Sequence, residues 1–383
     1  MKRLWEIDAA RGLMLVLMTV THVPSRLTDP VGQPFGFVSA AEGFVLLSAF
    51  VSGLVYSRIG YQKGVDVMRS AFWRRALKIY FSQAALLLFL FTVITAVGLK
   101  LDQPAVKDLV RYYLASPHDA LMFSLLLVYQ PALLDILPMY ILFMLMSPWV
   151  IAFAMHRGWQ WPMALSATLW AISQFGSTHW LYEVLSPALH IPVPYNETGS
   201  FDTFSWQFLW FFGMWMGASR NAPDAAPFVF PKWILASAVL VAVACFSWRH
   251  LGPGGQAPFG EDPGLNLLFD KWRLGPLRLL NLAALGIVAI RFGPPLLHRL
   301  PRPRWLEDMG SASLPVFCAH LVAVFVVMSV SGGGYAALPY GADLLILAVV
   351  FVGLYGVARV VLRWEDRGKQ VVPPDAPPGR SAS

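Results

Sequence analysis

Residues 8–22 read Asp8-Ala9-Ala10-Arg11-Gly12-Leu13-Met14-Leu15-Val16-Leu17-Met18-Thr19-Val20-Thr21-His22, a segment hydrophobic enough to enter a bilayer that still carries an acid, an arginine and a histidine. In a helix, Arg11 and His22 share one face, because eleven residues make about three turns with a rise of about 16 Å. Asp8 precedes Arg11 by three positions, the spacing of an ion pair on a helix. Ionisable groups within a membrane helix are costly, so the segment predicts a functional site.

The composition of the whole chain indicates an integral membrane protein. Its 383 residues are 57% hydrophobic and only 13% charged, with a mean hydropathy of +0.56, whereas soluble domains are about 25% charged. We therefore expect an all-α, polytopic membrane protein of about ten transmembrane helices. The ten predicted spans are residues 11–27, 38–57, 76–98, 133–155, 160–176, 204–219, 233–250, 274–292, 311–331 and 342–362.

The distribution of basic residues predicts the orientation. With the N-terminus inside, 21 of the 29 Lys and Arg residues fall on the inner side of these spans, so both termini are expected to be cytoplasmic. Acids precede the first apolar run and no small-x-small cleavage pattern follows it, which favours a retained first span over a signal peptide. Residues 1–365 are predicted to form one transmembrane domain, and the Pro-rich segment 366–383 a disordered cytoplasmic tail.

Several function classes have no support in the sequence. Cys245 and Cys318 both lie in apolar stretches, where packing is the simplest role for a cysteine. CxxC, HExxH and P-loop patterns are absent. We expect no metal site, no tightly bound cofactor and no nucleic-acid partner.

His22 and Glu42 are the two candidate catalytic residues. A lone intramembrane histidine can simply form a hydrogen bond to a neighbouring helix, but Arg11 and Asp8 on the same face favour a catalytic base. Glu42 lies one or two turns into the second span, at a depth similar to that of His22, and Ser39-x-x-Glu42 matches a capping box. Glu42 could also orient His22 and raise its basicity. The two roles of Glu42 are compatible.

Basic residues on the inner side are candidates for binding an anionic cofactor group. Arg11 could be a snorkelling anchor, yet Asp8 would neutralise it, and an arginine leading to His22 could instead bind a phosphate or carboxylate. The cluster Arg69, Arg74, Arg75 and Lys78 could be a collar for lipid phosphates or a landing site for a phosphorylated donor such as coenzyme A.

Two further polar residues lie in or next to predicted spans. His320 has Ser313 seven positions earlier on the same helical face, and a structural hydrogen bond is its simplest role. Asp135, close to Pro138, could cap the fourth span or face an acceptor.

Four motifs occur in order along the chain: Ile7-Asp8-x-x-Arg11-Gly12, Ala40-Ala41-Glu42-Gly43-Phe44-Val45-Leu46-Leu47-Ser48, Gln130-Pro131-x-Leu133-Leu134-Asp135-Ile136-Leu137-Pro138-Met139-Tyr140 and Gly310-x-x-Ser313-Leu314-x-Val316-Phe317. With an arginine and a histidine separated by ten residues in the first span, they resemble the membrane acyltransferases of acyltransferase family 3, and more closely the OpgC branch. One motif departs from that branch. Where the branch reads Phe-Asn-Pro-x-x-Trp-Gln, this chain has Phe201-Asp202-Thr203-Phe204-Ser205-Trp206-Gln207.

The resemblance implies a multi-pass enzyme of the bacterial inner membrane. It would move an acyl group, succinyl in this branch, from cytoplasmic acyl-CoA as co-substrate to hydroxyls of a periplasmic glucan. His22 would act as general base with Glu42, and the donor would be held by Asp8, Arg11, Arg74, Arg75 and Lys78. The acceptor would be held by Asp135, Trp206, Gln207 and His320.

Two other functions fit the same residues. A transporter or flippase for a small acid or a lipid-linked sugar would also place ionisable groups within its spans, although no internal repeat of the transporter kind is visible. A scaffold for glucan assembly would need none of these groups. The sequence does not predict the oligomeric state.

Overall fold

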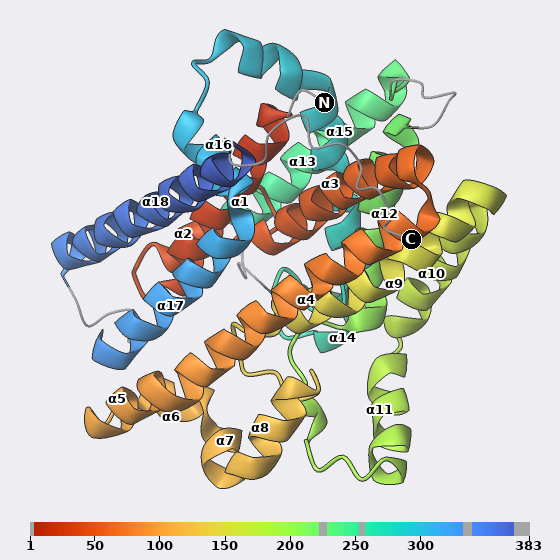
Figure 1. Cartoon of the computed structure of the whole chain (residues 1–383). Coiled ribbons are helices and arrows are strands. Elements are labelled where there is room, and N and C mark those ends of the chain that lie inside the picture. Colours follow the sequence, from red (N-terminus) through yellow and green to blue (C-terminus); the bar gives the residue numbers. More distant parts are fainter. Residues whose placement is uncertain (1–3, 222–227, 253–256, 332–338, 371–383) are drawn as a thin grey trace.

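The computed structural model describes residues 4–221, 228–252, 257–331 and 339–370, and within them it is all helical, with no strand. In Figure 1 the long helices form one bundle, with α18 at one edge and α10 at the opposite edge. The helices of sixteen or more residues are α1 (Trp5–His22), α3 (Ala40–Lys63), α4 (Val65–Phe89), α9 (Ile136–Arg157), α12 (Thr203–Ala218), α13 (Lys232–Leu251), α15 (Pro276–Arg299), α17 (Ser313–Ser331) and α18 (Tyr340–Gln370).

Shorter helices lie between the long ones. Those near the start of the chain are α2 (Thr28–Gly32), α5 (Thr95–Lys100), α6 (Pro104–Leu109), α7 (Arg111–Ala115) and α8 (Pro117–Leu125). Those farther along are α10 (Gln160–Ser173), α11 (Ser177–Ala188), α14 (Pro263–Asn266) and α16 (Arg304–Ser311). A π-helical turn η1 (Leu90–Ile94) joins α4 to α5, and 3₁₀ turns are η2 (Tyr195–Glu197), η3 (Ser219–Asn221) and η4 (Leu267–Phe269).

Each of the ten predicted spans contains a helix in the structure, although some bounds differ: α1 ends at His22, five residues before the predicted end of the first span. Among the residues that the structure describes, seven helices are long and apolar enough to cross a membrane: α3, α4 continued through α5, α9, α13, α15, α17 and α18. The other three are α1, which carries Glu6, Asp8 and Arg11 in 18 residues, and the shorter α10 and α12. At 1.5 Å per residue, α10 and α12 are about 21 and 24 Å long, less than the ~30 Å hydrocarbon core. The count of ten spans therefore stays a prediction.

Two helix contacts depend on glycines. Gly12 of α1 and Gly310 of α16 lie against each other's backbones, and a Cβ atom added to Gly310 would lie 1.8 Å from the Asp8 carbonyl oxygen. Between α3 and α12, a Cβ atom on Gly217 would lie 2.0 Å from the Phe50 carbonyl oxygen. Small residues let membrane helices approach this closely. The first and the last of the four motifs thus form a single helix contact.

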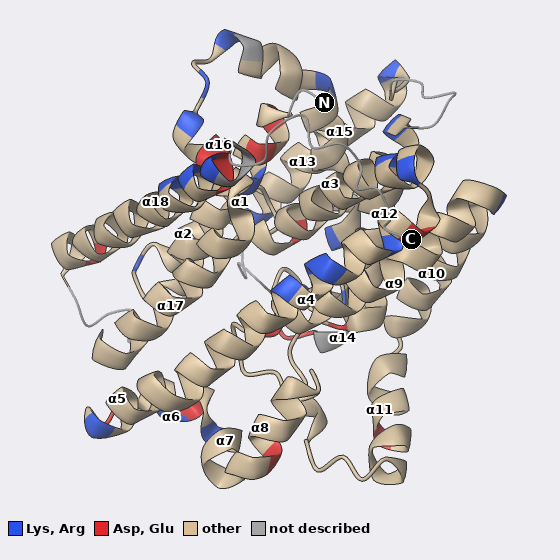
Figure 2. Ribbon diagram, viewed as in Figure 1, with Lys and Arg blue, Asp and Glu red and all other residues tan. Residues whose placement is uncertain are grey.

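Charged residues are unevenly distributed over the bundle. Figure 2 shows Lys and Arg gathered around α16 and the adjoining end of α18, where Arg359 lies 3.1 Å from Asp308. This end of the molecule is the one predicted to face the cytoplasm. Helix α18 continues through residues 366–370 of the predicted tail, and residues 371–383 lie outside the described part of the chain.

Candidate active site

The N-terminal part of α1 forms buried polar contacts with α16 and α17. The Arg11 guanidinium donates from Nη2 to the Ser313 hydroxyl, and its Nη1 lies 3.7 Å from Asp8 Oδ1. The Ser311 hydroxyl donates to Asp8 Oδ2 over 3.2 Å. Asp8 and Arg11 are 6% and 8% exposed, so this is an internal site rather than a surface anchor.

A small cavity of about 30 Å³ adjoins Arg11, and Arg75 of α4 lines it as well. Its other walls include Ser48 and Tyr140. Two of the five predicted donor-binding residues therefore meet at one point. Arg74 and Lys78 lie on the exposed surface of α4 instead.

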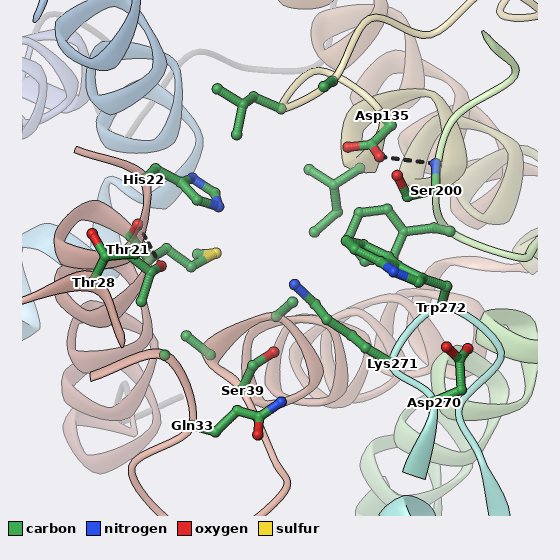
Figure 3. Close-up of a pocket in the computed structure, with 18 of the residues that line it drawn as sticks. Thr21, His22, Thr28, Gln33, Ser39, Asp135, Ser200, Asp270, Lys271 and Trp272 are labelled. Atoms are coloured by element: carbon green, nitrogen blue, oxygen red, sulfur yellow. Dashed lines mark hydrogen bonds between the residues drawn. The ribbon is translucent and has the colours of Figure 1, made fainter. Parts of the chain in front are cut away.

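The other end of α1 opens onto a much larger cavity of about 610 Å³. Figure 3 shows His22 and Lys271 pointing into the same space, His22 from α1 and Lys271 from the loop that precedes α15. Asp135, Ser39 and Gln33 also line it, and its aromatic lining comes from Phe201, Phe269, Trp272 and Phe317. Polar groups above aromatic surface suit a carbohydrate, whose faces are apolar and whose edges are hydroxyls.

The two cavities share part of their walls. Ile136 and Phe317 line both, so the small cavity beside Arg11 and the large cavity beside His22 adjoin at these two side chains. The Phe317 ring stacks on Phe44, with ring centroids 6.0 Å apart.

His22 is hydrogen-bonded to His320, not to Glu42. The His22 Nδ1 atom lies 3.1 Å from His320 Nε2, and His320 Nδ1 lies 2.7 Å from the Phe317 carbonyl oxygen. His320 is completely buried, and among the described residues it does not line the large cavity. It lies behind His22, so its predicted place at the acceptor differs from its place in the structure.

Glu42 is held by two other residues. Its Oε2 accepts from the Ser39 backbone N–H over 3.1 Å and from the Ser39 hydroxyl, which confirms the capping box. Its Oε1 accepts from Arg278 Nε, in an ion pair that is almost fully buried. The hydrogen bonds of Glu42 therefore differ from the predicted pairing with His22, because Arg278 takes the carboxylate oxygen that could have faced the histidine.

Asp135 lies in the cavity wall, as one of its two predicted roles requires. Its Oδ2 accepts from the Ser200 backbone N–H over 3.1 Å. Burial raises the pKa of this carboxyl, and the hydrogen bond from Ser200 opposes part of that increase.

Among the described residues that line the large cavity, Trp206 and Gln207 do not occur. Both instead stabilise the structure next to the cavity. The Trp206 indole N–H donates to the Trp272 carbonyl over 3.0 Å, and the Asp202 N–H donates to the same oxygen. Gln207 bonds to Ser166 on α10. Trp206 thus fixes the loop that carries Lys271, while Gln207 joins α12 to α10.

Lys271 and Arg278 are functional candidates that the sequence analysis missed. The Lys271 amine lies over the Trp272 ring, 4.5 Å from its centroid. Burial lowers the pKa of this amine, Glu42 and Asp135 oppose the decrease, and Arg278 adds to it. Arg278 is 1% exposed and donates from Nη1 to the Phe269 carbonyl. The sequence did contain a signal for both residues. They are cations on the predicted outer side, where the positive-inside rule leaves few Lys and Arg residues.

The described residues contain no group of three or more His, Cys, Asp or Glu side chains placed to hold a metal ion. The groups available for chemistry include an imidazole pair, Lys271 and Asp135 at one end of α1 and guanidinium groups at the other.

The described part of the chain is an all-helical bundle that includes seven helices able to span a membrane, and one helix has buried polar sites at both ends. These features define a multi-pass membrane protein. The family model OpgC_C, described as OpgC protein, matches residues 3–366, and the chain belongs to this family. Membership implies a transferase role in glucan modification. A comparison with curated proteins gave no match, and neither did a comparison with solved structures.

Proposed function

We propose that this protein transfers an acyl group from cytoplasmic acyl-CoA, through the membrane domain, to a hydroxyl of a periplasmic glucan in the bacterial inner membrane. The acyl group is succinyl in the branch that the sequence resembles. The donor binds at the Arg11 end of α1, the acceptor binds in the large cavity, and His22 is the general base.

One observation carries this proposal. A single helix has Arg11 in the wall of the small cavity and His22 in the wall of the large one, and the two cavities share the wall residues Ile136 and Phe317. A thioester carbonyl that passes these side chains from the Arg11 side would reach an acceptor hydroxyl beside His22. A guanidinium suits the phosphate groups of coenzyme A.

The reaction needs a base because a sugar hydroxyl is a weak nucleophile. His22 accepts the hydroxyl proton while the acceptor oxygen bonds to the thioester carbonyl carbon. The carbon–sulfur bond then breaks, and the departing thiolate takes a proton from the His22 imidazolium. The products are an ester on the glucan and free coenzyme A. The Lys271 amine, in the same cavity, can stabilise the negative oxygen of the tetrahedral intermediate.

The test is turnover by purified protein in detergent with succinyl-CoA and a glucan, followed by release of free thiol and by the mass of the glucan. His22→Ala is expected to lower kcat by about 10²–10⁴-fold, the usual contribution of a general base. His118→Ala is the matched control, because the His118 side chain is 88% exposed. Wild-type turnover by a folded His22→Ala protein would contradict the proposal.

The same assay separates the enzyme from a transporter or flippase. Acyl transfer needs no second compartment, so it persists in detergent. A protein that shows no turnover in detergent but moves a glucan or a small acid across proteoliposomes would support the transporter instead.

A further inference from the structure

The two ring nitrogens of His320 have different partners, and this difference fixes the positions of protons. Nδ1 of His320 lies 2.7 Å from the Phe317 carbonyl oxygen, one turn earlier on α17, and Nε2 lies 3.1 Å from Nδ1 of His22. The two imidazole rings are nearly parallel, at 23°, with centroids 5.3 Å apart. Each imidazole is therefore held in one orientation.

The carbonyl oxygen decides the tautomer of His320. A carbonyl only accepts, so His320 Nδ1 carries the hydrogen. His320 is completely buried and its two hydrogen-bond partners are a carbonyl and an imidazole. Because no carboxylate is among them, a positive charge on this ring is strongly disfavoured and the ring is neutral. Its Nε2 then carries a lone pair and accepts.

The tautomer of His22 follows from that of His320. An accepting Nε2 on His320 requires a donating Nδ1–H on His22, and the neutral His22 ring then has its lone pair on Nε2. His22 lines the large cavity, so this lone pair belongs to the nitrogen that is free to act on a ligand there. The resting state of the pair is a base presented to the cavity.

We propose that His320 is the positioning residue of the acyl transfer, a role that rests on the proposed function. Its Nε2 holds His22 in the Nδ1–H tautomer and aims Nε2 at the acceptor hydroxyl, and the Phe317 carbonyl in turn holds His320. When His22 takes the acceptor proton, the new positive charge lies against the His320 lone pair. His320 thus does with a neutral ring what an aspartate does for the histidine of a serine-protease triad.

A neutral partner suits this location. Glu42, the carboxylate that the sequence predicted beside His22, is paired with Arg278 instead. A second buried carboxylate beside His22 would need a cation of its own to offset the cost of burying its charge. The His22–His320 pair carries no net charge at rest and needs none. The neutral partner stabilises the imidazolium less than a carboxylate does, so most of its effect is on the orientation and tautomer of His22.

Two substitutions separate this role from simple packing. His320→Leu keeps the volume and removes the acceptor, so it is expected to lower kcat by about 10- to 100-fold, a part of what the base contributes, with little change in KM for the glucan. His320→Gln places an amide oxygen near the position of Nε2, where it can accept from His22 Nδ1–H, and is expected to restore most of kcat. His118→Gln is the exposed control.

The tautomer itself is measured by ¹⁵N NMR of histidine-labelled protein in lipid bilayers, with the His22 signals assigned by difference from His22→Gln. The wild type is expected to show a protonated Nδ1 and an unprotonated Nε2 for His22. His320→Leu should add a protonated Nε2 form, and His320→Gln should not. All variants are first checked for a wild-type elution volume and Tm.

The outcomes also distinguish the two proposals. A protonated Nε2 on His22 in the wild type, or full kcat in His320→Leu, overturns the positioning role even if His22→Ala is inactive. The expected tautomer in the wild type combined with full turnover by His22→Ala overturns the proposed function, and with it the catalytic use of the pair.

Discussion

The two ends of α1 differ in how much room they leave for a ligand. At the Arg11 end, α16 touches the backbone of α1 through Gly12 and Gly310, and the adjoining cavity is about 30 Å³. At the His22 end, the cavity is about 610 Å³ and its wall combines loops from four parts of the chain. Under the proposed function, the acceptor site is thus preformed, whereas the donor must displace packed side chains at the Arg11 end.

The two ends of α1 are also stabilised by different interactions. The Arg11 end depends on close backbone packing and short side chains, Ser311 and Ser313. The His22 end depends on the buried ion pair of Glu42 and Arg278, which ties the start of α3 to the start of α15. Substitutions that weaken the packing at one end of α1 should therefore leave the structure of the other end unchanged.

The largest effect is expected at the His22 end. Arg278→Leu leaves the buried Glu42 carboxylate without its cation, and removing one partner of a buried ion pair costs about 3–5 kcal/mol. Thermal unfolding in detergent should show a large loss of stability. The double variant Arg278→Leu with Glu42→Leu should recover much of it. Arg302→Leu is the control, since its ion pair with Glu307 is half exposed. Equal losses for the single and double variants would show that the pair is not what holds this end.

The next effect is expected at the Arg11 end. Gly310→Ala places a Cβ atom 1.8 Å from the Asp8 carbonyl oxygen, so α1 and α16 must separate. Overpacking of this kind costs about 1–3 kcal/mol. Size-exclusion yield and Tm measure the loss. Gly286→Ala is the matched control, because a Cβ atom on that α15 glycine meets nothing within 4 Å. An unchanged Tm for Gly310→Ala would mean that the two helices do not depend on this contact.

A smaller effect is expected at the boundary between the two cavities. Phe317→Leu shortens the side chain that both cavities share but keeps the backbone carbonyl that His320 uses. Under the proposed function, water should reach the thioester more easily, so hydrolysis of acyl-CoA without acceptor should rise several-fold relative to transfer. Phe325→Leu, also buried on α17, is the control. An unchanged ratio of hydrolysis to transfer would mean that Phe317 does not separate the two sites.

The smallest effect is expected at Asp135, and it depends on pH. Burial raises the pKa of this carboxyl above its ordinary value of 3.8. The group therefore stabilises the fold below pH 3.8, and that contribution is lost as the pH rises through the raised pKa. Asp135→Asn has no such loss, so its Tm relative to wild type should increase as the pH rises above about 4. A constant difference across this range would contradict the assigned burial. The exposed Asp66→Asn variant controls for the loss of one negative charge.

Local features of the molecule could be predicted from the sequence. Arg11 and His22 lie on one helix because the apolar run is continuous, and Ser39 and Glu42 form the capping box because both residues lie within one helical turn. The seven apolar helices follow from length and composition. Helices α10 and α12 were predicted as spans from hydropathy, which counts apolar residues and does not show whether a helix crosses the bilayer alone.

Pairings between distant residues could not be predicted in the same way. His22 and His320 are 298 positions apart, and Glu42 and Arg278 are 236 positions apart. No periodicity connects such positions, and several partners were chemically acceptable for each. Glu42 was a chemically reasonable partner for His22, but in the structure Glu42 pairs with Arg278, a cation with no local motif around it, and His22 pairs with His320.

The distance along the chain between the partners of Arg11 also has a consequence for biosynthesis. Arg11 is synthesised before Ser313, whose hydroxyl it binds and which comes 302 residues later. At about 5–20 residues per second, roughly 15–60 s pass between the two. During that interval the ion pair with Asp8, one helical turn away, can already neutralise the charge of Arg11. A helix that supplies its own counter-charge can insert into the membrane before α16 and α17 are synthesised and pack against it.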